Sequence, residues 1–212
     1  PMMRNRKASN HPVKRAPEAL AAAKAAAKRC RGDFWVQKDA QVHRNELGGL
    51  AAELSDLTEP DYNDLDMLAQ VHYRLGLVEA YASFADDGTR QTREYKAALD
   101  AFDDSLHVRT GLLELDELDD QQRLQQRRGL QDTLAEMVET SDCHEDFASS
   151  AARYVEWKEV VGALDASSNT WRQSYSKVFF DRIESLGTRE ETQRAVGGAR
   201  TDGAGGAGGG AR

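Results

Sequence analysis

Apolar residues recur at intervals of three and four along most of the chain, and no stretch alternates apolar and polar residues convincingly with a period of two. The clearest run is Tyr95, Ala98, Leu99, Phe102 and Leu106, whose spacing places all five on one helical face. Similar runs at 33–57, 61–88, 118–138 and 147–183 predict further helices. We therefore predict an all-α fold of seven to eight helices, arranged as a single compact bundle or as stacked helical hairpins.

Residues that favour helix ends predict the element boundaries in the first half of the chain. Pro17 at a first helical position and Gly32 just past a last one predict an Ala-rich helix between them. In "TEPD", residues 58–61, Thr58 is expected to cap the next helix. The pair Gly48-Gly49 predicts a kink or a close helix crossing within the helix that contains it.

Similar signals predict the boundaries in the second half. Ser141, with Glu145 nearby, is expected to begin the helix that bears Phe147. Gly187 is expected to stop a helix that follows "SSNT", and "TREE" at 188–191 reads as a capping box for a short last helix.

Charge is distributed unevenly between the first 31 residues and the rest of the chain. Residues 1–31 hold nine Lys or Arg and one acidic residue, a net charge of +8, whereas the remainder carries −16. We expect a flexible basic arm with an Ala-rich helix at 1–32, a helical body at 33–196 and a flexible Gly-rich tail at 197–212. Because the arm's helix has only Leu20 and Cys30 as larger apolar groups, deleting residues 1–31 should leave the melting of the body nearly unchanged.

The basic arm is the strongest functional signal, because its cations can bind outward. They would neutralise an acidic face of a partner protein, including a second copy of this chain, or the phosphates of a nucleic acid. A solvated tail without a partner is the alternative. A polyanion would repel the acidic body beyond about 8 Å, the Debye length at physiological salt, so we prefer a protein partner. The residues expected to contact partners are Arg4, Arg6, Lys7, Lys14, Arg15, Leu20, Lys24, Lys28, Arg29 and Arg31 in the arm, and Arg123, Arg127 and Arg128 in a second basic strip.

One stretch resembles a tetratricopeptide repeat. Tyr95, Ala98, Phe102 and Ser105 fall at the spacing of the Tyr, Ala, Phe and small-residue positions in the second helix of that repeat, and Leu75-Gly76 matches its Leu-Gly pair. Residues 72–105 are therefore similar to one such hairpin. The connection is longer than in the repeat and no second copy follows, which favours an ordinary amphipathic hairpin.

A second resemblance is to the small terminase subunits of tailed bacteriophages. It rests on the basic start, the segment bearing Trp35 and the helix start "LTEPD" at 57–61. It implies an alternative function, a nucleic-acid-binding packaging or regulatory factor whose arm contacts phosphates.

Candidate chemistry is sparse. "DCHED", residues 142–146, is the only cluster of metal-ligand types, but consecutive residues of a helix cannot converge on one ion, and its acids suit a helix N-terminus. Asp103 with His107, and His72 with Tyr73, could exchange protons, although such groups are ordinarily surface pairs. The chain has no nucleophile elbow, HExxH, phosphate loop or dinucleotide glycine pattern. We predict no catalytic, cofactor or metal site and a non-enzymatic protein.

The apolar segments and the cysteines limit where the protein can be located and what class of protein it is. No apolar run approaches the roughly 18 residues of a membrane span, and the N-terminal stretch lacks the apolar segment of a secretory signal. Cys30 and Cys143 give no disulfide framework, which favours a reducing compartment. We expect an intracellular, organellar or virion protein: a structural or adaptor subunit of a large assembly, such as a virion, a ribosome-like complex or an organellar complex.

Overall fold

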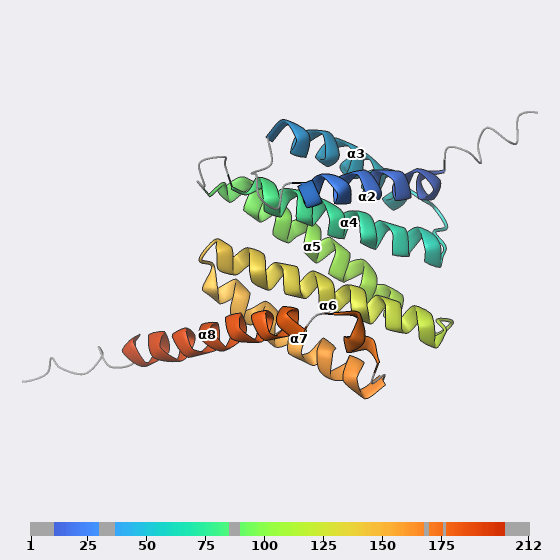
Figure 1. Cartoon of the computed structure of the whole chain (residues 1–212). Coiled ribbons are helices and arrows are strands. Elements are labelled where there is room, and N and C mark those ends of the chain that lie inside the picture. The colour runs from blue at the N-terminus through green and yellow to red at the C-terminus, as the bar shows by residue number, and fades with distance from the viewer. Residues whose placement is uncertain (1–10, 30–36, 85–89, 168–169, 176, 202–212) are drawn as a thin grey trace, which may run out of the picture. The chain divides into compact units, whose positions relative to one another are not determined.

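The computed structural model describes residues 11–29, 37–84, 90–167, 170–175 and 177–201, and within them the protein is all-α, as predicted (Figure 1). These residues form no β-strand, only an isolated bridge between Phe84 and Arg90. The elements are α2 (Pro12–Arg29), α3 (Gln37–Ser55), α4 (Tyr62–Ala82), α5 (Thr92–Leu113), α6 (Asp120–Cys143), α7 (Phe147–Ser167), the 3-10 helix η1 (Trp171–Ser174) and α8 (Lys177–Thr201).

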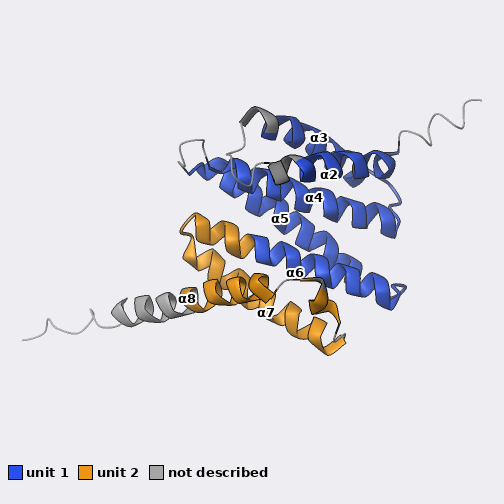
Figure 2. Cartoon of the chain, in the orientation of Figure 1, with its two compact units in different colours: residues 1–136 blue, residues 137–212 orange. Residues whose placement is uncertain are grey.

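The chain divides into two compact units (Figure 2). Unit 1 ends at Glu136 and unit 2 begins at Met137, so the division falls within α6. The predicted boundary at residue 32 lies outside the described residues. At the other end, α8 continues to Thr201, and the rest of the predicted tail, residues 202–212, lies outside them as well.

Helices α4 and α5 pack along each other in unit 1. The predicted start of α5 at Thr92 is confirmed, and the predicted inward residues Tyr95, Ala98 and Phe102 are buried. Gly76 of α4 faces Phe102: a Cβ added at Gly76 would lie 2.5–2.9 Å from three atoms of the ring. The absence of a side chain at Gly76 therefore sets how closely the two helices approach.

We expect Gly76→Ala to lower the free energy of unfolding by about 1–3 kcal/mol, because Phe102 is fully buried and its ring has little room to withdraw. Gly49→Ala is the matched control: it also replaces a helical glycine, but a Cβ there meets nothing within 4 Å. The control should stabilise the protein by up to about 1 kcal/mol through helix propensity alone. Urea unfolding followed by circular dichroism measures both changes, and equal effects would contradict the close-contact explanation.

The expectation that the Ala-rich helix packs weakly is wrong. Ala16, Ala19 and Ala23 form a fully buried face of α2, which we call the alanine face, and it belongs to the same core as the leucines of α3 and α4. The helix also begins at Pro12, earlier than the predicted Pro17, so the favourable first-position proline is Pro12. Alanine side chains bury little apolar area. They let helices approach closely, however, and the dense packing that results compensates for the small buried area.

Two other predicted helix features in unit 1 are wrong. Asp61, not Thr58, caps α4: its side chain accepts a hydrogen bond from Asp64 N at 2.9 Å, and the Asp64 side chain accepts one from Asp61 N at 3.1 Å. The capping box therefore starts three residues later than predicted. Helix α3 runs on through Gly48-Gly49, and a Cβ at either position would meet nothing within 4 Å, so the predicted close helix crossing is wrong. The alternative, a kink in the helix, stays a prediction.

Unit 2 is built around aromatic side chains from α7, η1 and α8. Trp157, Trp171 and Phe180 are buried, and the Trp171 and Phe180 ring centroids lie 5.5 Å apart in an edge-on arrangement. Trp171 Nε1 donates a hydrogen bond to Asp165 Oδ1 at 2.8 Å, which satisfies its polar group.

Gly187 does not stop a helix, because α8 continues through it and through "TREE". Gly187 is buried, and a Cβ there would run into the ring of Tyr154 on α7. Gly187 therefore allows α8 to pack closely against α7 and does not end the helix. Thr188, predicted as a cap, is inside the helix and donates its hydroxyl to Glu184 O at 2.8 Å.

Candidate interaction surface

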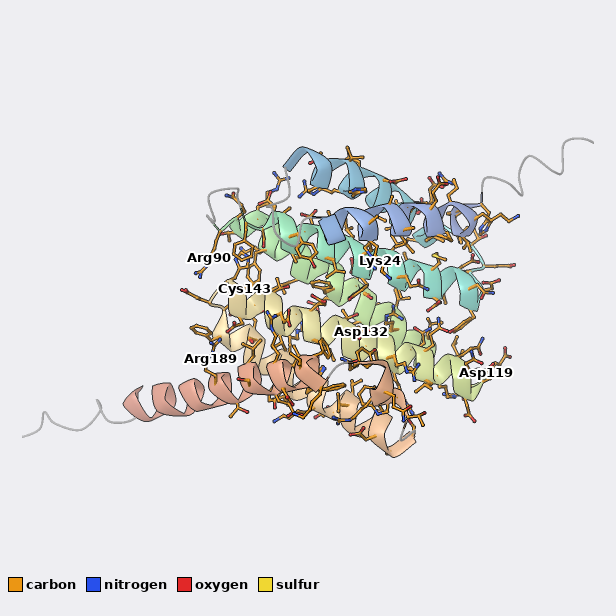
Figure 3. The ribbon with its side chains drawn as sticks, in the orientation of Figure 1. Lys24, Arg90, Asp119, Asp132, Cys143 and Arg189 are labelled. Atoms are coloured by element: carbon orange, nitrogen blue, oxygen red, sulfur yellow. The ribbon has the colours of Figure 1, made fainter. Side chains whose placement is uncertain are left out.

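The outward face of α2 carries the described cations of the basic segment. Lys14, Arg15 and Lys24, the last of which is labelled in Figure 3, are exposed on the helix, whereas the alanine face is buried. The alternation of large cations and alanines along α2 therefore gives one face for packing and another for solvent. The sequence predicted that these cations contact a partner. It did not predict that the helix which carries them packs against α3 and α4.

Some of the predicted contact residues of α2 have partners within unit 1. The Arg15 guanidinium pairs with the Glu53 carboxylate on α3. Leu20 is half-buried and packs against the core. Lys14 and Lys24 have no ion pair with any residue that the structure describes, and they are the cations of this face that remain open to a partner.

Other predicted residues of the basic segment cannot be placed. Arg4, Arg6, Lys7 and Arg31 lie outside the described residues, and Lys28 and Arg29 are described only as backbone of α2. Their role as contacts stays a prediction.

The second predicted strip lies on α6 and is only half-exposed. Arg123 turns back on its own chain: its guanidinium donates to the backbone oxygens of Leu113, Leu115 and Asp116 at 3.1–3.3 Å. These oxygens follow the end of α5, where carbonyls lack helical partners. Arg127 and Arg128 are also half-buried. The strip therefore offers less free charge than α2 does.

Sequence reasoning missed a buried polar network that joins α4, α5 and α6 in unit 1. Its centre is Asp66 of α4, which lies 3.8 Å from Arg109 of α5, and both side chains are buried. Gln126 of α6 links the two, because its amide nitrogen donates to Asp66 Oδ1 at 2.8 Å and its oxygen accepts from Arg109 Nη1 at 2.9 Å. Further bonds to these residues come from Tyr62, Gln70 and Gln125.

We call these residues the Asp66–Arg109 network. Burial lowers the pKa of Arg109, while the nearby Asp66 charge opposes that change and favours the charged form. Gly129 of α6 lies against the guanidinium, where any Cβ would collide with it. The polar run "QQRLQQRR" at 121–128 contains no apolar residue except Leu124, yet its Gln126 is fully buried. The network attaches the first part of α6 to α4 and α5 by specific hydrogen bonds.

The cluster of metal-ligand residue types at 142–146, where no metal site was predicted, lies at the end of α6 and in the connection to α7. Asp142 pairs with Arg189 of α8, and both Arg189 and the neighbouring Cys143 are labelled in Figure 3. Asp146 begins α7, accepting a hydrogen bond from Ser149 N at 3.2 Å, so the predicted start at Ser141 is wrong. Glu145 adopts a left-handed conformation with φ of 59°, which turns the chain between the helices. Among the described residues, no three His, Cys, Asp or Glu side chains could hold a metal ion together.

The two candidate acid–base pairs lie on different helices. Asp103 and His107 are exposed on α5, whereas His72 of α4 is half-buried with its Nδ1 3.5 Å from Asp104 Oδ2. Burial lowers the pKa of His72, and the Asp104 charge partly opposes this.

Because the neutral form of His72 is favoured in the folded state, its contribution to stability is present above the unfolded pKa of about 6.5 and is lost as pH falls toward the lower folded value. We expect His72→Gln to show a smaller loss of stability than the parent protein between pH 7.5 and 5.5. Denaturant unfolding at both pH values measures the difference. His107→Gln, at an exposed position on α5, is the control, and an equal change in both variants would contradict this assignment.

No family model matches this sequence, and neither the curated proteins nor the solved structures include a significant match. The resemblances to tetratricopeptide repeats and small terminase subunits therefore rest only on the residues quoted above. No helix within the described ranges is both long enough and apolar enough to cross a bilayer.

Proposed function

We propose that this protein is a non-enzymatic helical structural or adaptor subunit of a larger assembly, anchored to an acidic partner surface by its basic N-terminal segment. The observation that carries the proposal is the charge asymmetry: nine cations and one acid in residues 1–31, against a net charge of −16 in the remainder. Such a chain is complementary to an acidic protein surface, and also to a second copy of its own body.

The packing of α2 supports this proposal. Because the alanine face is buried, Lys14 and Lys24 project from a helix that is already folded and docked. A partner then binds cations whose backbone is ordered in advance, which reduces the entropy lost on association. An acidic protein is favoured over nucleic acid because the acidic remainder of the chain opposes the approach of a long polyanion.

The test is a salt titration of binding by the full chain to a short poly-L-glutamate peptide, no longer than α2, which stands for a local acidic patch on a protein surface, and to random duplex DNA. We expect poly-L-glutamate to bind at low salt, and the variant K14Q/K24Q to bind it several-fold more weakly because two exposed cations are lost. K96Q is the matched control, since Lys96 is exposed on α5 outside the basic segment.

The outcomes separate the two functions. DNA binding stronger than poly-L-glutamate binding, with a log–log salt slope of about −0.9 for each phosphate neutralised, would favour the nucleic-acid packaging or regulatory factor instead. Failure to bind either polyanion at low salt would contradict both functions.

A further inference from the structure

Helices α3, α4 and α5 of unit 1 enclose a pocket of about 470 Å³ that none of the features above explains. It is lined by four charged side chains, Arg44, Glu79, Arg93 and Glu94, by the amide side chain of Gln41, and by Ala82 and Ala97. The volume falls in the usual range of small-molecule sites, roughly 300–1,000 Å³. The kind of ligand that it can bind depends on which of the charged side chains are already paired and which are accessible.

Arg44 and Glu79 neutralise each other within the pocket. Arg44 donates from Nε to Glu79 Oε1 and from Nη2 to Oε2, the latter at 2.6 Å, and its Nη1 donates to Gln41 at 2.7 Å. Glu79 is almost fully buried, and its hydrogen bond to Arg44 raises the pKa of that guanidinium. This pair is a fixed part of the wall with no net charge, so a ligand has little reason to displace it.

Arg93 and Glu94, in the first turn of α5, are the more accessible charges of the pocket. Arg93 is exposed and makes no hydrogen bond or ion pair with any residue that the structure describes. Glu94 is half-exposed, and its charge acts on Arg44 at longer range. One cation and one anion next to each other favour a ligand that brings both signs. An inorganic polyanion would instead face the carboxylate of Glu94.

The remaining lining favours a short apolar group. Ala82 is buried and Ala97 half-buried, and their methyl groups leave open space where larger side chains would fill it. A ligand with an aliphatic side chain would cover the methyl group of the half-buried Ala97 and remove its apolar surface from water.

We propose that this pocket binds a free α-amino acid with an uncharged aliphatic side chain, its carboxylate on Arg93, its ammonium on Glu94 and its side chain over Ala97. Carboxylate and guanidinium form charge-assisted hydrogen bonds, as do ammonium and carboxylate. This inference is independent of the proposed anchoring function, because the pocket residues do not include Lys14 or Lys24.

The first experiment titrates the full chain with L-valine, L-leucine and L-methionine by calorimetry and ligand-observed NMR. We expect at least one of them to bind with a Kd below about 1 mM. N-acetyl-leucine lacks the ammonium and leucine methyl ester lacks the carboxylate, so each should bind at least about tenfold more weakly than leucine. Inorganic phosphate should not compete. No binding at about 10 mM of any of the three amino acids would overturn the proposal.

The second experiment uses variants. R93Q and E94Q should each raise the Kd at least about tenfold, because each removes one charge-assisted contact. K96Q is the matched control, since it removes an exposed charge from the same helix without lining the pocket, and it should leave the Kd unchanged. An affinity that neither R93Q nor E94Q alters would place the ligand elsewhere and overturn the assignment. Phosphate that competes with the amino acid would do the same.

Discussion

Asp66→Ala should lower the free energy of unfolding by about 3–5 kcal/mol, the cost of leaving a buried charge without its partner. Arg109 is only 5% exposed, and Asp66 is the carboxylate at 3.8 Å from its guanidinium. The same change removes the acceptor of amide hydrogen bonds from Gln70, Gln125 and Gln126. The loss therefore extends over all three helices that the network joins.

Urea unfolding of the full chain measures this effect, with Asp100→Ala as the matched control. Asp100 is an exposed acid on α5, and its removal should change stability by no more than about 0.5 kcal/mol. The double variant D66L/R109M should recover a large part of the loss, since it removes both charges together. A double variant as unstable as D66A would show that the loss comes from the glutamine hydrogen bonds and not from the unpaired charge.

Ala19→Glu should destabilise the protein by about 3–5 kcal/mol, because it forces a larger, charged side chain into the packed alanine face. Ala19 is 2% exposed and belongs to the core that α2 shares with α3 and α4. For the same reason, deletion of residues 1–31 is now expected to lower the melting temperature, in contrast to what the composition of the segment suggested.

Ala22→Glu provides the control for this prediction. Ala22 is exposed on the same helix, and the substitution keeps the same change in charge and side-chain size. It should alter stability by less than about 0.5 kcal/mol. Melting curves followed by circular dichroism compare the two variants, and equal effects at both positions would show that α2 is not docked as described.

The helical class and several of its stripes could be predicted because large apolar residues repeat with the helical period. Tyr95, Ala98 and Phe102 were placed on one helical face by spacing alone, and all three are buried. Val42 and Val178 lie within the runs predicted as helices at 33–57 and 147–183, yet they are 58% and 75% exposed. Spacing shows which residues share a face, but it does not show how far a neighbouring helix covers that face.

The candidate interaction surface could be predicted only in part. The excess of cations in residues 1–31 is a property of composition, so the sequence showed it directly. Which of those cations is already paired depends on the position of another helix. Arg15 meets Glu53 from 38 residues away, and nothing in the local sequence of either residue indicates this.

By itself, the sequence determined the all-α class and the segregation of charge, because helical period and formal charge are local properties. Only the tertiary structure decided that an alanine-rich helix is core and that Gly76 and Gly187 are contact points. It also placed the polar residues Asp66, Arg109 and Gln126 inside. Each of these depends on what lies opposite the residue: an alanine is buried by a close neighbour, a glycine is required by a facing ring, and a buried charge is stable only beside its partner.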